Sequence, residues 1–281
     1  MSSGPSGVIG WRCTGALLLS SVAFLGCAGG APLLHPARAL PAGDIRAAGG
    51  LSGQIAVGSA ADDLRNARAQ AATSPQPQGD PGTNPTYAKG ALVAAAIAPG
   101  VAPYVSARVG LGYGGEGGIT YTGRSVRLDI RKSFDVGDVS YSAGVGVTVP
   151  FYGRHQGGDL PNVDLSSIHG YGADIPLLVG WESPGGIYKI WAGPRGGWEH
   201  VTIGNLTSEP KDGAPNTGGD ALSADRFYAG AVLGFAVGFR HVHVALELEG
   251  AYNYASGTYN DNKVSVQGVA LTPASALWWT F

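Results

Sequence analysis

The chain has 281 residues, of which only 14% are charged, and its net charge is −2. Soluble domains carry about 25% charged residues, whereas the mean hydropathy of +0.07 is too low for a bundle of membrane helices. Such a composition favours a transmembrane β-barrel, because lipid-facing and lumen-facing residues alternate along its strands and average out. The lack of a basic excess argues against nucleic acid as a partner.

Residues 1–26 are predicted to be a secretion signal. Their apolar run, 15–25, is too short to cross a bilayer, which needs about 20 residues, but it suits the hydrophobic core of a signal peptide. The Leu-Gly-Cys sequence that ends at Cys27 resembles a lipobox, the processing site of bacterial lipoproteins. This resemblance implies cleavage before Cys27, lipidation of that cysteine, and an N-terminal linker over 27–43. Ordinary cleavage within 28–31 is the competing interpretation.

From residue 44 to the C-terminus, apolar and polar residues alternate in a series of runs that predict β-strands. The clearest run, 241–254, places valine, leucine and tyrosine on one face and histidine and glutamate on the other. In 119–131 the apolar positions change from odd to even at Gly123-Arg124. One unbroken strand cannot do this, so a tight turn or a bulge is expected there.

The predicted fold is therefore all-β: an antiparallel, up-and-down transmembrane barrel over residues 44–281. An eight-strand barrel is an alternative, with 117–131 as one strand and 44–57 outside the barrel. The preferred barrel has ten strands, at 44–57, 103–112, 117–122, 125–134, 139–151, 171–181, 187–203, 225–238, 241–254 and 266–281.

The lengths of the connections predict the orientation of the barrel. Long polar segments at 58–89, 152–168 and 204–224, with a modest one at 256–263, alternate with short turns. Barrels of the outer membrane have long external loops and short periplasmic turns, so the long segments are expected to be external. Within the first, 60–73 is predicted to form a short helix. The apolar stretch 91–97 either extends the second strand or caps the barrel.

The chain ends in Phe281, and Trp279 and Leu277 share its strand face. This pattern resembles the C-terminal insertion signal of bacterial outer-membrane proteins, a terminal aromatic residue preceded by apolar residues at alternate positions. The resemblance implies a location in the bacterial outer membrane, with membrane lipid as surroundings and the barrel assembly machinery as a partner during biogenesis. A small barrel behind a lipobox also resembles uncharacterised barrels of gliding and predatory Gram-negative bacteria.

The polar parity of the strands assigns a balanced set of charges to the lumen. A barrel of eight to ten strands has an interior about filled by side chains, and buried charges must be paired. The expected interior is therefore a plug of salt bridges that closes and stiffens the barrel. Its predicted members are Arg46, Arg108, Arg127, Asp129, Arg131, Asp174, Glu182, Lys189, Arg195, Glu199, Glu247 and Glu249.

No motif for catalysis or cofactor binding is found, so no catalytic residue and no cofactor are predicted. His241 and His243 are weak candidates for metal ligands, with Glu247 beyond them on the same face. The predicted function is a non-enzymatic barrel with a structural or surface-interaction role and a surface or periplasmic protein as partner. A narrow solute channel is the first alternative. A barrel-embedded hydrolase, resembling the omptin proteases or the enzymes that modify lipid A, is the second.

Overall fold

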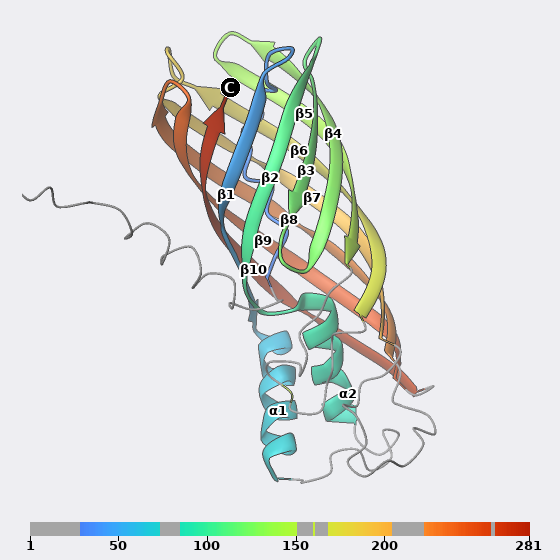
Figure 1. Ribbon diagram of the computed structural model, residues 1–281. Coiled ribbons are helices and arrows are strands. Elements are labelled where there is room, and N and C mark those ends of the chain that lie inside the picture. Colours follow the sequence, from blue (N-terminus) through green and yellow to red (C-terminus); the bar gives the residue numbers. More distant parts are fainter. Residues whose placement is uncertain (1–28, 74–84, 151–159, 161–167, 204–221, 260–261) are drawn as a thin grey trace, which may run out of the picture.

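A computed structural model describes residues 29–73, 85–150, 160, 168–203, 222–259 and 262–281. In this part of the chain, antiparallel strands close into a barrel in which each strand bonds its neighbours in sequence and β1 bonds β10 (Figure 1). The predicted barrel of ten strands is confirmed. The strands are β1 Ile45–Val57, β2 Gly100–Gly112, β3 Gly115–Tyr121, β4 Ser125–Val136, β5 Val139–Pro150, β6 Ile168–Glu182, β7 Tyr188–Ile203, β8 Leu222–Phe239, β9 Val242–Tyr259 and β10 Asn262–Thr280.

The alternative with eight strands is wrong for two reasons. Strand β1 closes the barrel, because it pairs with β10 on one side and with β2 on the other. Strands β3 and β4 are separate strands joined by a tight turn, in which Gly123 has a φ of 57° and Thr122 N donates to Ser125 O at 3.0 Å. The turn lets Tyr121 face Val126, so the apolar side chains of both strands stay on the same face.

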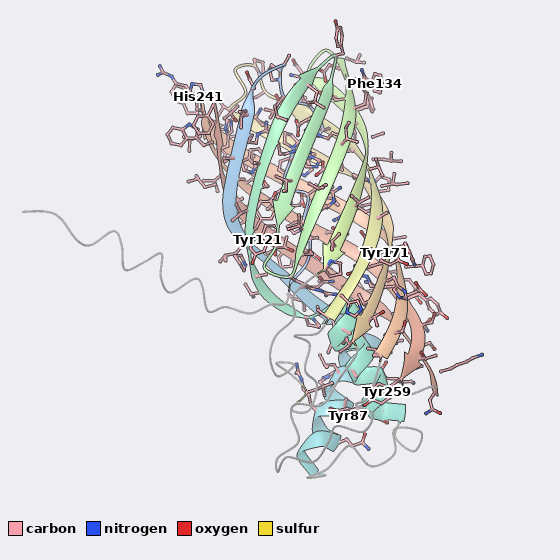
Figure 2. The ribbon with its side chains drawn as sticks, turned by 45° about the vertical axis from the view of Figure 1, so that its right-hand side comes forward. Tyr87, Tyr121, Phe134, Tyr171, His241 and Tyr259 are labelled. Carbon is pink, nitrogen blue, oxygen red and sulfur yellow. The ribbon has the colours of Figure 1, made fainter. Side chains whose placement is uncertain are left out.

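The outer surface of the barrel is apolar and the inner face is polar, as the alternation predicts. In β9, for example, Leu246 and Leu248 are exposed on the outside, whereas Glu247 and Glu249 are buried inside. Figure 2 shows Phe134 on the outside near one end of the barrel, and Tyr121 and Tyr171 on the outside farther toward the other end. Aromatic residues at two levels, with aliphatic residues between them, are typical of a membrane-facing band.

The end of the chain has the alternating arrangement that its sequence predicts. Leu277, Trp279 and Phe281 are exposed on the outer surface, and Trp278 between them is buried in the lumen with 1% of its surface exposed. Backbone hydrogen bonds between Phe281 and Ile45 tie the C-terminus to the start of β1. This end of the barrel, where β1 begins and β10 ends, is called the terminus end below.

Helices cap the opposite end, which is called the helical end (Figure 1). They are α1 Ser59–Thr73, α2 Pro85–Leu92 and the π-helical turn η3 Val93–Ile97. Every residue of η3 is buried, in a cluster that includes inward-facing residues of β7 and β8. Of the two possibilities for 91–97, the structure therefore has the cap. None of the described helices is both long and apolar enough to cross a membrane.

Two expected loops differ from their predictions. The modest loop expected at 256–263 is largely strand, since β9 continues to Tyr259 and β10 begins at Asn262. The expected external loop 58–89 is helical at both ends, with α1 at its start and the first residues of α2 at its end. Helix α1 confirms the helix predicted at 60–73. The loops predicted at 152–168 and 204–224 lie mostly outside the described residues, as do the signal peptide and Cys27.

Candidate functional site

Residues 29–43, here called the plug segment, lie inside the barrel. Their side chains include Leu33, Leu34 and Ala37, which are fully buried against lumen residues such as Trp191. The segment begins at the helical end, where Gly29 N donates to Ala98 O, and finishes at the terminus end, where Gly43 N donates to Gly110 O. The sequence predicted an N-terminal linker over 27–43, and residues 29–43 of it lie inside the lumen. The segment is apolar enough to fill a lumen, and the barrel supplies the hydrogen bonds that its backbone needs.

Glu247 of β9 holds the middle of the plug segment by its backbone. Leu33 N donates to Glu247 Oε1 at 2.7 Å, and Leu34 N donates to Oε2 at 2.8 Å. Trp191 Nε1 of β7 also donates to Oε2, at 2.9 Å. Leu34 has a φ of 47°, in the left-handed region, and consecutive N–H groups that converge in this way form a concavity suited to an anion. The structure places Glu247 in the lumen, as predicted, but its hydrogen-bond partners are not cations.

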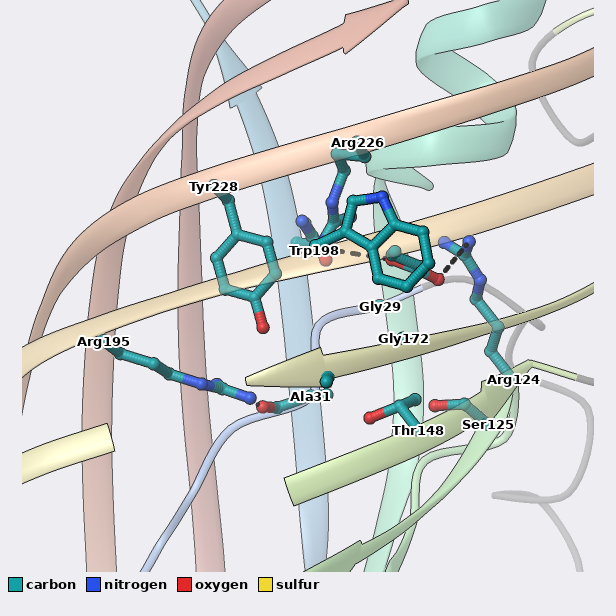
Figure 3. Close-up of a pocket in the computed structure, with 13 residues that line it drawn as sticks. Gly29, Ala31, Arg124, Ser125, Thr148, Gly172, Arg195, Trp198, Arg226 and Tyr228 are labelled. Atoms are coloured by element: carbon teal, nitrogen blue, oxygen red, sulfur yellow. Dashed lines mark hydrogen bonds and ion pairs between the residues drawn. The ribbon is translucent and has the colours of Figure 1, made fainter. Parts of the chain in front are cut away.

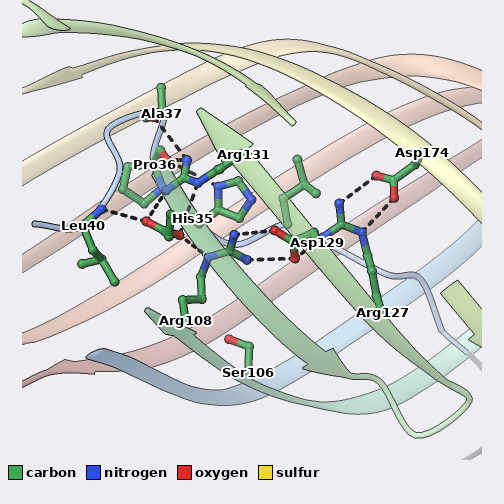
Figure 4. Close-up of polar contacts among 12 residues, drawn as sticks. His35, Pro36, Ala37, Leu40, Ser106, Arg108, Arg127, Asp129, Arg131 and Asp174 are labelled. Atoms are coloured by element: carbon green, nitrogen blue, oxygen red, sulfur yellow. Dashed lines mark hydrogen bonds and ion pairs between the residues drawn. The ribbon is translucent and has the colours of Figure 1, made fainter. Parts of the chain in front are cut away.

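Like Glu247, the pair Glu116 and Arg131 forms a clamp, that is, a set of hydrogen bonds from the wall to the plug segment. This second clamp holds the last part of the segment (Figure 4). Arg131 donates to the carbonyl oxygens of residues 36–38 and to both carboxylate oxygens of Glu116. Leu40 N donates to Glu116 Oε2 at 2.8 Å. The sequence prediction missed Glu116 because it assigned that residue to a turn. In the structure β3 begins at Gly115, so Glu116 is an inward-facing strand residue with no exposed surface.

From Glu116, acids and arginines alternate along the inner wall in a set here called the charge ladder. Arg108 bridges Glu116 and Asp129, Arg127 bridges Asp129 and Asp174, and Arg195 bridges Asp174 and Glu249. The distances between nitrogen and oxygen are 2.5 Å for Arg108–Asp129, 2.6 Å for Arg127–Asp129, 2.8 Å for Arg127–Asp174, 2.8 Å for Arg195–Asp174 and 2.8 Å for Arg195–Glu249.

The ladder also contacts the plug segment, since Arg195 Nη1 donates to Ala31 O at 2.7 Å. Each interior arginine of the ladder lies between two carboxylates, so the buried charges compensate one another. Removing one member of such a buried set leaves a charge unpaired and costs several kcal/mol. The ladder therefore stiffens the wall and holds the plug segment at the same time.

Glycines opposite the arginines provide the space for this ladder. A Cβ on Gly146 would lie 2.3 Å from Arg127 Nη2, and one on Gly118 would lie 2.6 Å from Arg108 Nη1. Both distances are far below a van der Waals contact, so no larger residue fits without moving the guanidinium. At these two positions the size of the arginine on the neighbouring strand therefore requires glycine.

A separate cluster closes the helical end, where Arg124 and Arg226 share Glu199, each at 3.4 Å (Figure 3). Arg124 Nη2 donates to Ala95 O at 2.7 Å, and Arg226 Nη1 donates to Ala96 O. Cations close to the last carbonyls of a helical segment are favourable. Burial lowers the pKa of the Arg124 guanidinium, and the charge of Glu199 opposes that shift. The sequence prediction placed Glu199 in the lumen but missed both arginines.

The remaining predicted lumen residues lie toward the terminus end. Lys189 pairs with Glu182 at 3.1 Å, and Arg38 of the plug segment approaches the same carboxylate at 3.6 Å. Arg46 lies over the ring of Trp278, with 4.9 Å between its Cζ and the ring centroid. The structure thus brings together most of the predicted lumen charges, but in three groups rather than in one balanced network.

The two histidines considered as metal ligands bind backbone carbonyls. A ring nitrogen of His241 donates to Thr280 O at 2.8 Å, and His243 Nε2 donates to Gly186 O at 2.9 Å. Within the described ranges, no group of three or more histidine, cysteine, aspartate or glutamate residues is arranged to hold a metal ion. Glu247 and Glu249, which were expected beyond these histidines, are committed to the plug segment and to Arg195.

No protein-family model matches the chain, and no curated protein matches its sequence. The arrangement of the residues themselves therefore carries the inference about function.

Proposed function

We propose that this protein is a closed barrel of the bacterial outer membrane, with a structural or surface-interaction role and no catalytic activity. The observation that carries the proposal is the filling of the lumen. The plug segment runs from the helical end to the terminus end, and it is held by Glu247, by Glu116 with Arg131, and by Arg195. A barrel of ten strands has little interior space beyond that of its side chains, so a further chain segment leaves no open path.

The outer surface and the C-terminal pattern support the membrane location. The apolar residues on the outside form a continuous band between aromatic levels, which a barrel in water would have to expose to solvent. We place the helical end at the cell surface and the terminus end in the periplasm, because short turns and the C-terminus gather at the terminus end. The long segments at the helical end would then be the ones that meet a surface partner.

Lipidation of Cys27 remains part of this proposal. Its support is the Leu-Gly-Cys sequence that ends at Cys27. Mass spectrometry of the mature N-terminus should show acylation in the natural protein and its loss in Cys27→Ala.

Conductance in planar lipid bilayers tests the closed barrel. The purified protein should produce no steady ionic current, whereas Arg131→Ala, which removes the clamp on residues 36–38, should produce transient openings. Retention of the compact, heat-modifiable form on gels would show that the variant still forms a barrel. A steady current through the natural protein would instead support the narrow channel. Hydrolysis of peptides or of lipid A by the purified protein would contradict the absence of catalysis.

A further inference from the structure

A cavity of about 350 Å³ lies at the terminus end of the lumen, between the plug segment and the barrel wall. It is separate from the charge ladder and from the cluster around Glu199. Its lining is rich in positive charge. The cationic side chains are Arg38, Arg46, Lys189 and Arg240, and the acids are Asp44 and Glu182.

Arg46 differs from the other cations of this lining because it is buried without an ion pair among the described residues. It is 5% exposed, and its Nε and Nη1 atoms are buried without a hydrogen-bond partner. Within the part of the chain that the structure describes, Arg46 has no ion pair, although the other lumen arginines each contact a carboxylate. Its guanidinium lies over the ring of Trp278. A cation–π contact is a weak substitute for the water and the counterion that a buried guanidinium loses.

Two of the nearby acids already have other partners. Glu182 is shared by Lys189 at 3.1 Å and Arg38 at 3.6 Å, and Glu116 is held by Arg131 and by the plug segment. Both act on Arg46 electrostatically without pairing with it, and Asp44, the other acid of the lining, forms no ion pair with it among the described residues. The positive charge of the cavity and the guanidinium of Arg46, which has no ion pair among the described residues, favour an anion as the ligand of this cavity.

We propose that this cavity binds a small oxyanion, a phosphate or carboxylate group, with Arg46 as its principal ligand and Trp278 as the wall that orients the guanidinium. The planar fork of an arginine matches the two oxygens of such a group. Lys189, which lines the same cavity, adds a second positive charge. In the proposed orientation the cavity opens toward the periplasm, so the ligand comes from that side or from a lipid headgroup at the rim.

Thermal unfolding of the purified full-length protein in a neutral detergent tests this proposal. A ligand that binds only the folded state raises the unfolding midpoint. Inorganic phosphate and acetate should each raise the midpoint more than sodium chloride at the same ionic strength. Vesicles of phosphatidylglycerol, compared with phosphatidylcholine, distinguish a headgroup from a free anion as the source.

Arg46→Gln should abolish the specific effect of phosphate, and calorimetry should show at least tenfold weaker binding. Arg46→Lys, which keeps the charge without the fork, should give an intermediate loss. Lys263→Gln, at the exposed beginning of β10, is the matched control and should bind as the natural protein does. The proposal is overturned if neither anion nor anionic vesicles stabilise beyond chloride. The same holds if Arg46→Gln keeps the full stabilisation.

Discussion

The carboxylate of Glu247 accepts the backbone N–H of Leu34 at 2.8 Å, across 213 positions in the sequence. This contact joins the plug segment to the wall that surrounds it. It also makes the conformation of Leu34, which is unfavourable for a residue with a Cβ, dependent on a strand formed much later in the chain. The stability of the plug segment and that of the barrel are therefore coupled.

Replacing Glu247 should release the plug segment. In Glu247→Ala the N–H groups of Leu33 and Leu34 and the indole N–H of Trp191 lose their acceptor. Each buried donor left unpaired costs about 1–3 kcal/mol. Hydrogen exchange followed by mass spectrometry should show faster exchange across 29–43. Glu247→Gln, which keeps one acceptor oxygen, should have a smaller effect. Unchanged exchange at Leu33 and Leu34 in the alanine variant would contradict the clamp.

Asp174 is the member of the charge ladder whose loss should be most damaging, because it lies between Arg127 and Arg195. In Asp174→Ala both guanidinium groups lose one of their two carboxylates in a buried site. The free energy of unfolding in urea should fall by about 3 kcal/mol. Asp62→Ala is the control, since its pair with Arg65 in α1 is well exposed and should contribute little. Equal losses in the two variants would show that the ladder does not stabilise the barrel.

Gly146 should not tolerate a side chain. The Cβ of Gly146→Ala would lie 2.3 Å from Arg127 Nη2, so the guanidinium must leave its position against Asp174. The variant should be less stable by about 1–3 kcal/mol, measured as a lower midpoint for loss of the compact form on gels. Gly49→Ala, in β1, meets nothing within 4 Å and should be neutral or slightly stabilising. A neutral Gly146→Ala would mean that Arg127 can adopt another paired position.

The orientation of the barrel can be tested with introduced cysteines. Asn66 is exposed on α1 at the helical end, and Asp138 is exposed in the turn between β4 and β5 at the other end. A membrane-impermeant maleimide should label Asn66→Cys on intact cells, and label Asp138→Cys only after the outer membrane is permeabilised. Both variants should be made in a Cys27→Ser background, so that the natural cysteine does not react. The reverse pattern of labelling would place the helices in the periplasm.

Much of the barrel could be predicted because strand periodicity is a local property. The change of parity at Gly123-Arg124 is visible in the sequence, and it separates β3 from β4 whatever surrounds them. The inner face of β9 could be predicted for the same reason, since a slip of one residue would turn Glu247 and Glu249 toward the outer surface of the barrel. Glu116 was missed where this reasoning is weakest, at the end of a short strand next to a glycine-rich turn.

By itself, then, the sequence favoured ten strands over eight and predicted the face that most strand residues present, because residues of a strand point alternately to its two faces. The position of the plug segment was decided by tertiary structure alone. Residues 29–43 have no periodicity, and their partners lie far along the chain: Glu116 is 76 positions from Leu40, and Glu247 is 214 positions from Leu33. A segment without regular secondary structure adopts a defined position only when the closed wall supplies hydrogen-bond partners for its backbone N–H and C=O groups. The same closure decided which charges pair, because it brings strands distant in sequence close enough for their arginines and acids to meet.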